Sequence, residues 1–182
     1  MNKRNGEIKG VIFCLITTLT IVGWLVGSAT QAVAETTKYK LTSYITYIEN
    51  LPVGDTAGHV LSVSSRKGLA LFENGEVAIY TNWSTLDFIK GNGSVQGYSI
   101  LTYPDGSTTV HKIQGTIEAG IQKLTGEFIR GTGKFEGIKG SLSITGKSMT
   151  PYSKEKGTMG DAYYDITATY TFLRSDQLGK KV

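Results

Sequence analysis

Three side chains of this sequence could move a proton in a reaction: Glu127 in "LTGEFIRG", Glu76 in "ENGEVAIY" and His111 in "TTVHKIQG". A carboxylate held among apolar side chains has a raised pKa and can transfer a proton near neutral pH. A histidine titrates in that range without perturbation. If the protein is an enzyme, Glu127, Glu76 and His111 are therefore the candidate catalytic residues.

Each candidate lies in a run of alternating residues, so that apolar neighbours share its face of an extended strand. Glu127 shares a face with Ile129, and His111 shares one with Ile113. Glu76 shares a face with Ala78 and Tyr80. The alternative is that both glutamates face solvent, as most glutamates do, and that the histidine is a satisfied residue of the core or rim. The sequence leaves both interpretations open.

Tyrosines are the second group of candidates, because each offers an apolar ring and a hydroxyl to a bound molecule. The chain contains ten. We predict that Tyr44, Tyr98 and Tyr164 line a ligand pocket. Strand propensity alone explains many of the others.

Other kinds of chemistry lack their residues. His59 and His111 are the only histidines and Cys14 is the only cysteine, so no metal-ligand spacing is present. No nucleophile elbow and no glycine loop leading into a helix is present either. We expect no metal and no cofactor. The mildly basic charge gives no reason to expect nucleic acid.

The elements that must position these residues are strands. Short alternating runs recur between turn residues, and no long helical stripe is present. "ENGE" predicts a tight hairpin at Asn74-Gly75. The predicted strands are Tyr39 to Glu49, His59 to Ser64, Leu69 to Glu73, Glu76 to Asn82, Ser94 to Tyr103, Thr108 to Glu118, Leu124 to Ile129, Gly137 to Thr145 and Tyr163 to Phe172. Eight or nine strands with hairpin-sized connections predict an all-β antiparallel barrel or sandwich with little helix.

Glycine usage favours the barrel. The stretch "FIRGTGKFEGIKGSLSITGK", from Phe128 to Lys147, holds five glycines among alternating strand residues. Glycine within a strand marks a bulge, a corner or a close backbone approach, and a closed sheet needs such points. We therefore expect a strand, a glycine-rich corner at Gly131 to Gly140, and a second strand of the same sheet.

The segments "YPDGSTTV", "GTGKFEGIKGSLSITGK" and "GDAYYDITATYTF" resemble the allene oxide cyclase and dirigent superfamily of small β-barrels. The likeness covers the C-terminal half well and the N-terminal half only by strand count. It implies an eight-stranded antiparallel barrel with an apolar internal cavity, often assembled as a trimer. No catalytic residue of any branch matches position by position, so none is transferred.

Two functions follow from the resemblance and the residues together. The first is a cyclase or isomerase that folds a hydrophobic small molecule into a reactive conformation inside the barrel. The alternative is a non-catalytic binder of such a molecule, or an interaction module of the cell envelope. The enzyme needs a buried acid or base, whereas the binder needs only an apolar cavity with a few hydroxyls.

The N-terminus reads as a signal peptide of a bacterial exported protein. Basic residues precede the apolar run "VIFCLITTLTIVGWLV", and Ala32-Val33-Ala34 fits signal peptidase. We predict cleavage after Ala34, a barrel domain over 35–174, a basic tail over 175–182, and a periplasmic or secreted location without a membrane span. The remaining chain keeps 16 basic and 14 acidic residues, a net charge of +2.

Overall fold

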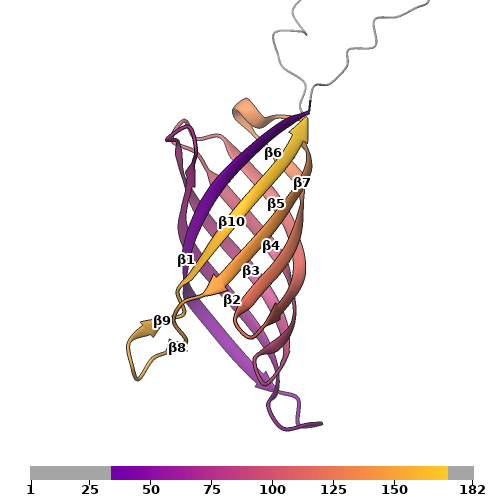
Figure 1. Ribbon diagram of the computed structural model, residues 1–182, viewed down its shortest axis with the longest axis vertical. Coiled ribbons are helices and arrows are strands. Elements are labelled where there is room, and N and C mark those ends of the chain that lie inside the picture. Colours follow the sequence, from indigo (N-terminus) through magenta and orange to yellow (C-terminus); the bar gives the residue numbers. More distant parts are fainter. Residues whose placement is uncertain (1–33, 172–182) are drawn as a thin grey trace, which may run out of the picture. The chain divides into compact units, whose positions relative to one another are not determined.

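A computed structural model describes residues 34–171 of the chain as a closed antiparallel barrel of eight strands (Figure 1). The strands of the barrel are β1 (Glu35–Pro52), β2 (His59–Phe72), β3 (Val77–Ile89), β4 (Asn92–Thr102), β5 (Thr108–Glu118), β6 (Ile121–Gly131), β7 (Lys139–Ser148) and β10 (Ala162–Thr171). The predicted fold class is confirmed. The predicted signal peptide and basic tail lie outside the described residues.

Successive strands are neighbours around the barrel, and β10 pairs with both β7 and β1 to close it. The closing pair runs from Glu35 opposite Tyr170 to Ser43 opposite Ala162. A separate hairpin of β8 (Tyr152–Ser153) and β9 (Thr158–Met159) lies in the connection from β7 to β10. None of the helical structure within 34–171 is long and apolar enough to cross a membrane.

Strand alternation divides the side chains between the barrel interior and its outer surface. Most of the buried core is apolar, and its members come from every strand of the barrel: Tyr39, Leu41, Ala70, Ala78, Tyr80, Val95, Leu101, Ile113, Leu124, Leu142, Ile144, Tyr164, Ile166 and Ala168. A bulge in β1 between Ile45 and Tyr47 shifts the alternation by one residue, so that the positions facing inward change. Beyond the bulge Ile48 faces inward, while Tyr47 is exposed.

Two glycines of the stretch Phe128 to Lys147 show why this part of the sheet needs residues without a side chain. The corner between β6 and β7 contains a short 3-10 helix, Gly133–Phe135, and Gly133 takes a φ of 59° that other residues rarely adopt. Within β7, a Cβ at Gly146 would lie 2.3 Å from Cδ1 of Tyr164. The missing side chain at Gly146 therefore makes room for the Tyr164 ring in the interior.

The segment "SRKG", which separates the predicted strands His59 to Ser64 and Leu69 to Glu73, does not interrupt the sheet, because β2 runs unbroken from His59 to Phe72. The alternation continues through this segment, so that one face of β2 carries Ser62, Ser64 and Arg66. Gly68 is required in the strand because a Cβ there would lie 1.8 Å from the carbonyl oxygen of Thr42.

The two ends of the barrel differ. The turns between β2 and β3 and between β4 and β5, with the 3-10 helix, surround one end, which we call the aromatic end. There the rings of Tyr39, Phe72, Tyr103 and Phe135 follow one another at centroid distances of 4.6, 5.7 and 4.5 Å. The other end, which we call the hairpin end, carries the β8–β9 hairpin and the turns after β1, β3 and β5.

Candidate functional site

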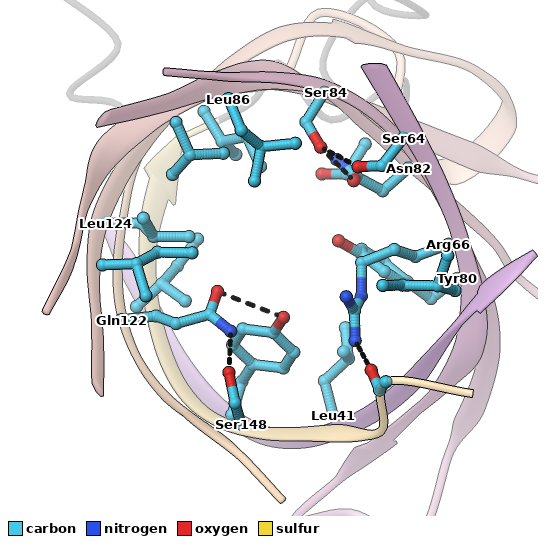
Figure 2. Close-up of a pocket in the computed structure, with 18 of the residues that line it drawn as sticks. Leu41, Ser64, Arg66, Tyr80, Asn82, Ser84, Leu86, Gln122, Leu124 and Ser148 are labelled. Atoms are coloured by element: carbon cyan, nitrogen blue, oxygen red, sulfur yellow. Dashed lines mark hydrogen bonds between the residues drawn. The ribbon is translucent and has the colours of Figure 1, made fainter. Parts of the chain in front are cut away.

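A cavity of about 250 Å³ occupies the barrel interior and extends to the hairpin end. Residues from all eight strands line it, and Gly91, Gly120, Pro151 and Gly160 from the turns and the hairpin connection lie at its mouth. Figure 2 shows the open space at its centre, with side chains directed into it from the surrounding strands. Eight-stranded barrels can hold one small ligand in such a space.

Polar side chains gather on the wall formed by β2 and β3. Ser64 pairs with Ser84 across the two strands, and the next inward pair is Arg66 with Asn82. The hydroxyls of Ser64 and Ser84 are 3.0 Å apart, and Ser84 Oγ donates to Asn82 Oδ1 at 3.2 Å. The antiparallel register therefore collects the polar groups of two strands at one place on the cavity surface (Figure 2).

Arg66 is the one charged residue at neutral pH among the described residues that line the cavity. Its Nε donates to Ser43 Oγ at 2.9 Å, and its Nη2 donates to the carbonyl oxygens of Ser43 and Gly160. Gly160 belongs to the connection between the hairpin and β10. Arg66 therefore joins the barrel wall to the base of the hairpin.

Tyr80 lies beside Arg66 on the same wall (Figure 2). Burial raises the pKa of its phenol well above the usual range, with a smaller increase from Tyr164 and an opposing effect of Arg66. The phenol is therefore neutral near pH 7 and keeps its O–H as a donor. It can donate to a bound molecule.

The opposite side of the cavity is mainly apolar. Leu124 lies across the space from Arg66 and Tyr80 in Figure 2, and further apolar side chains surround it: Val95, Ile113, Ile117, Leu142 and Ile144. One polar group interrupts this surface. Tyr164 donates to Gln122 Oε1 at 3.3 Å, and Gln122 Nε2 donates to Ser148 Oγ at 3.4 Å.

His111 closes the inner end of the cavity. It lies between this space and a smaller hollow of about 80 Å³ at the aromatic end, and it lines both. Nδ1 lies 3.1 Å from Ser99 Oγ, while Nε2 is buried without a partner among the described residues. Burial lowers the pKa of His111 to about 4, so the imidazole is neutral near pH 7.

The mouth of the cavity is built by the connection between β7 and β10. Thr150 and Asp161 fasten this connection, because Thr150 Oγ1 donates to Asp161 Oδ2 at 2.6 Å and accepts from the Asp161 amide at 2.9 Å. Thr150, Pro151 and Tyr152 then line the cavity on one side of the hairpin, and Gly160 lines it on the other.

Of the six predicted site residues, the structure brings His111 and Tyr164 to the cavity. Tyr44 and Tyr98 lie on the outer surface, with exposed fractions of 41% and 50%, which corrects their predicted place in the lining. Both tyrosines alternate with small buried serines, Ser43 and Ser99, that face inward instead.

The two glutamates do not reach the cavity. Glu127 lies on the outer surface opposite Lys112 and Ser141, because Leu124 and Gly126 take the inward positions of β6. Glu76 lines only the smaller hollow at the aromatic end, where it forms an ion pair with Lys134. The described lining of the cavity therefore contains no carboxylate.

Arg66, Tyr80 and the polar residues around them were not among the predicted site residues. A signal was present: Ser62, Ser64 and Arg66 alternate in phase with Ala70. The gap between the predicted strands His59 to Ser64 and Leu69 to Glu73 excluded Arg66 from this pattern. Within residues 34–171 no cluster of three histidine, cysteine or acidic side chains could hold a metal ion.

Among solved structures, the chain is similar to a pterocarpan synthase dirigent protein, at 11% sequence identity and a TM-score of 0.48, over 81% of this chain and 94% of that one. No protein-family model matches the chain. No curated protein sequence matches it either. The similarity in structure is too low to indicate a function, so the interpretation of the site rests on the cavity itself.

Proposed function

We propose that the barrel binds one small, largely apolar molecule in its interior and holds it in a fixed orientation. The observation that supports this is the cavity of about 250 Å³ with its polar groups on one wall and apolar side chains opposite. Ligand sites in proteins are typically apolar pockets with a few placed polar groups. A molecule with one polar end would direct that end towards the polar groups of β2 and β3.

The proposed function is binding and orientation of a ligand, and catalysis would be an additional step after binding. A cyclase or isomerase of the kind that the resemblance implies also begins by holding a flexible substrate in one conformation. Its proton transfers would depend on His111, Tyr80 and Tyr164, because the described lining has no carboxylate. With a pKa of about 4, His111 would act as a weak base rather than an acid near neutral pH.

Binding of a neutral apolar dye, such as N-phenyl-1-naphthylamine, tests the proposal by fluorescence titration. Leu124→Trp places a larger side chain in the cavity, and Thr125→Trp adds the same side chain on the outer face of the same strand. We expect saturable binding of one dye per barrel in the wild type and in Thr125→Trp. Leu124→Trp should weaken binding at least about tenfold, as loss of most of the apolar contact predicts.

Circular dichroism would establish that both variants keep the strand content of the wild type. Equal dye binding by the two tryptophan variants would place the dye on the outer surface and would reject the proposal. Absence of saturable binding to the wild type would reject it as well.

We also propose that the barrel associates with copies of itself, as the trimer that the resemblance implies. The supporting observation is on the outer face of β2 and β3, where exposed Leu69 and Leu71 pair with exposed Ile79 and Val77. Exposed apolar surface of this kind often marks an interface. Light scattering at micromolar concentration would show a multiple of the chain mass, and a monomer mass alone would contradict this part.

Export stays part of the proposal. The first strand begins at Glu35, the residue that the predicted cleavage would leave at the new N-terminus. Mass spectrometry of the protein recovered outside the cytoplasm should find a chain that begins at Glu35. An intact Met1 to Ala34 segment would contradict the predicted processing.

A further inference from the structure

We propose that the molecule held in the cavity is a monoanion, an apolar carboxylic acid or a compound of equivalent charge, whose acidic group pairs with Arg66. This inference rests on the proposed function, because it names the chemical class of the ligand that the cavity would take.

Arg66 carries a positive charge among described cavity residues that are otherwise neutral. The groups that accept hydrogen bonds from it are one hydroxyl and two backbone carbonyls. No described carboxylate lies within ion-pair distance of its guanidinium, and the residues lining the cavity include none. A partly buried cation is costly unless an anion compensates it. The cavity therefore favours a ligand that brings a negative charge.

The contacts of Arg66 with the described residues leave part of its donors unused. A guanidinium has five N–H groups in a planar fork. The bonds to Ser43 and Gly160 use Nε and Nη2, and Nη1 makes none with the residues that the structure describes. Tyr80 lies beside Arg66 on the same wall (Figure 2), and its hydroxyl is a further possible donor. Together they offer N–H and O–H donors suited to the two oxygens of a carboxylate.

Arg66 is the single cation among the described residues that line the cavity, and the rest of that lining is neutral. A phosphate group, which carries up to two charges, is typically bound by several cations or by a helix N-terminus. Here Leu124 and its apolar neighbours face the polar wall across the cavity (Figure 2). This arrangement fits a single negative charge at one end of an apolar body.

Two fluorescent probes of nearly the same shape test the inference: 2-naphthoate, which is an anion at pH 7, and 2-naphthamide, which is neutral. Both should compete with the neutral dye in wild-type protein. Because a charge-assisted hydrogen bond outweighs a neutral one, naphthoate should bind at least about tenfold more tightly than naphthamide. Arg66→Gln should bring this ratio close to one.

Lys67→Gln is the matched control, because Lys67 is the next residue of β2 and lies exposed on the outer face. It removes the same charge from the protein but should leave the naphthoate-to-naphthamide ratio unchanged. A ratio that falls equally in both variants would indicate a general charge effect on the surface and would overturn the inference.

Arg66 also holds Gly160, so Arg66→Gln could fail to fold for structural reasons. An independent measurement is the ¹⁵N–¹H signal of the Arg66 side-chain Nε, assigned by its absence in Arg66→Lys. Naphthoate should shift this signal in wild-type protein, and naphthamide should leave it nearly unchanged. Equal shifts with both probes, or none, would mean that Arg66 only fastens the hairpin.

The outcomes separate this inference from the proposed function. If naphthamide binds, Leu124→Trp blocks it, and naphthoate binds no better, the cavity binds apolar molecules but the monoanion inference is wrong. If neither probe binds to the wild type, both the inference and the proposed function fail.

Discussion

The aromatic end and the hairpin end are built by the same eight strands, yet one is nearly filled and the other is open. At the aromatic end the inward positions carry large rings, and the remaining hollow is about 80 Å³. Towards the hairpin end several inward positions of β2, β3 and β4 carry serines, such as Ser64, Ser84 and Ser99. The size of the inward side chains, and not the backbone, therefore decides where the barrel can hold a ligand.

Removal of a ring from the aromatic end should have the largest effect. Tyr103 is buried between Phe72 and Phe135, and Lys134 Nζ lies 4.7 Å from its ring centroid. We expect Tyr103→Ala to lower the free energy of unfolding by about 3–4 kcal/mol, as for other buried aromatic residues. Urea denaturation would measure it. Ser84→Ala, in the polar wall towards the other end, should cost no more than about 1 kcal/mol, and equal losses would remove the distinction between the two ends.

Low pH should destabilise the protein through His111, which is buried between the two ends. Its folded-state pKa of about 4 is below the unfolded value of about 6.5. The unfolded chain therefore takes up a proton first, and stability that is complete above pH 6.5 is lost as the pH falls towards 4. Between pH 7.5 and pH 4.5 the wild type should lose on the order of 2–3 kcal/mol more than His111→Gln.

Urea denaturation of the wild type and His111→Gln at both pH values would measure that difference. Comparison with the variant removes the contribution of carboxylates, which titrate in the same range. The same pH dependence in both proteins would mean that His111 is reached by water.

A smaller effect should follow from loss of the Tyr164 hydroxyl in the lining of the cavity. Tyr164→Phe keeps the ring over Gly146 but removes the hydrogen bond to Gln122. We expect a loss of about 1 kcal/mol in the free energy of unfolding. Tyr163→Phe, one residue earlier, removes an exposed hydrogen bond to Asp165 and should have less effect. If Tyr163→Phe cost as much as Tyr164→Phe, the polar contact inside the cavity would have no special role.

The smallest effect is expected at His59, and its sign is opposite to that of His111. Its ring nitrogens lie 2.9 Å from Asp87 Oδ1 and 2.6 Å from Asp55 Oδ1, and these hydrogen bonds raise the pKa of His59. The resulting stabilisation is present below pH 6.5 and is lost as the pH rises through the raised pKa. Asp87→Asn should reduce this loss between pH 6 and pH 8.5 in urea denaturation. A pH dependence equal to that of the wild type would contradict the pairing.

Strand alternation together with the placement of glycines was sufficient to predict the closed barrel and the corner at Gly131 to Gly140. Alternation could not assign the inner face where both faces of a strand carry apolar residues. In β6, Thr125, Glu127 and Ile129 alternate with Leu124, Gly126 and Phe128. The structure turns the second set inward, because Gly126 packs against Leu142 and Ile113 in the interior.

Two local features limited the prediction of the site. The bulge in β1 exchanges the inward position between Tyr47 and Ile48, and a single inserted residue leaves no clear mark on the pattern. Arg66 was missed because "SRKG" has the composition of a turn. Only the register with β1 and β3 shows that these residues continue the strand and direct the guanidinium inward.

The closing pair of β1 and β10 also has a consequence for how the chain folds. The pair joins Glu35 to Tyr170, so the sheet cannot become a closed barrel until nearly the whole described chain has been synthesised. Contacts between such distant parts of a sequence give a high contact order, which is associated with slow folding. Until β10 is in place, β1 and β7 present unpaired edges. A chain truncated before Ala162 would therefore be prone to aggregation rather than form a smaller version of the same barrel.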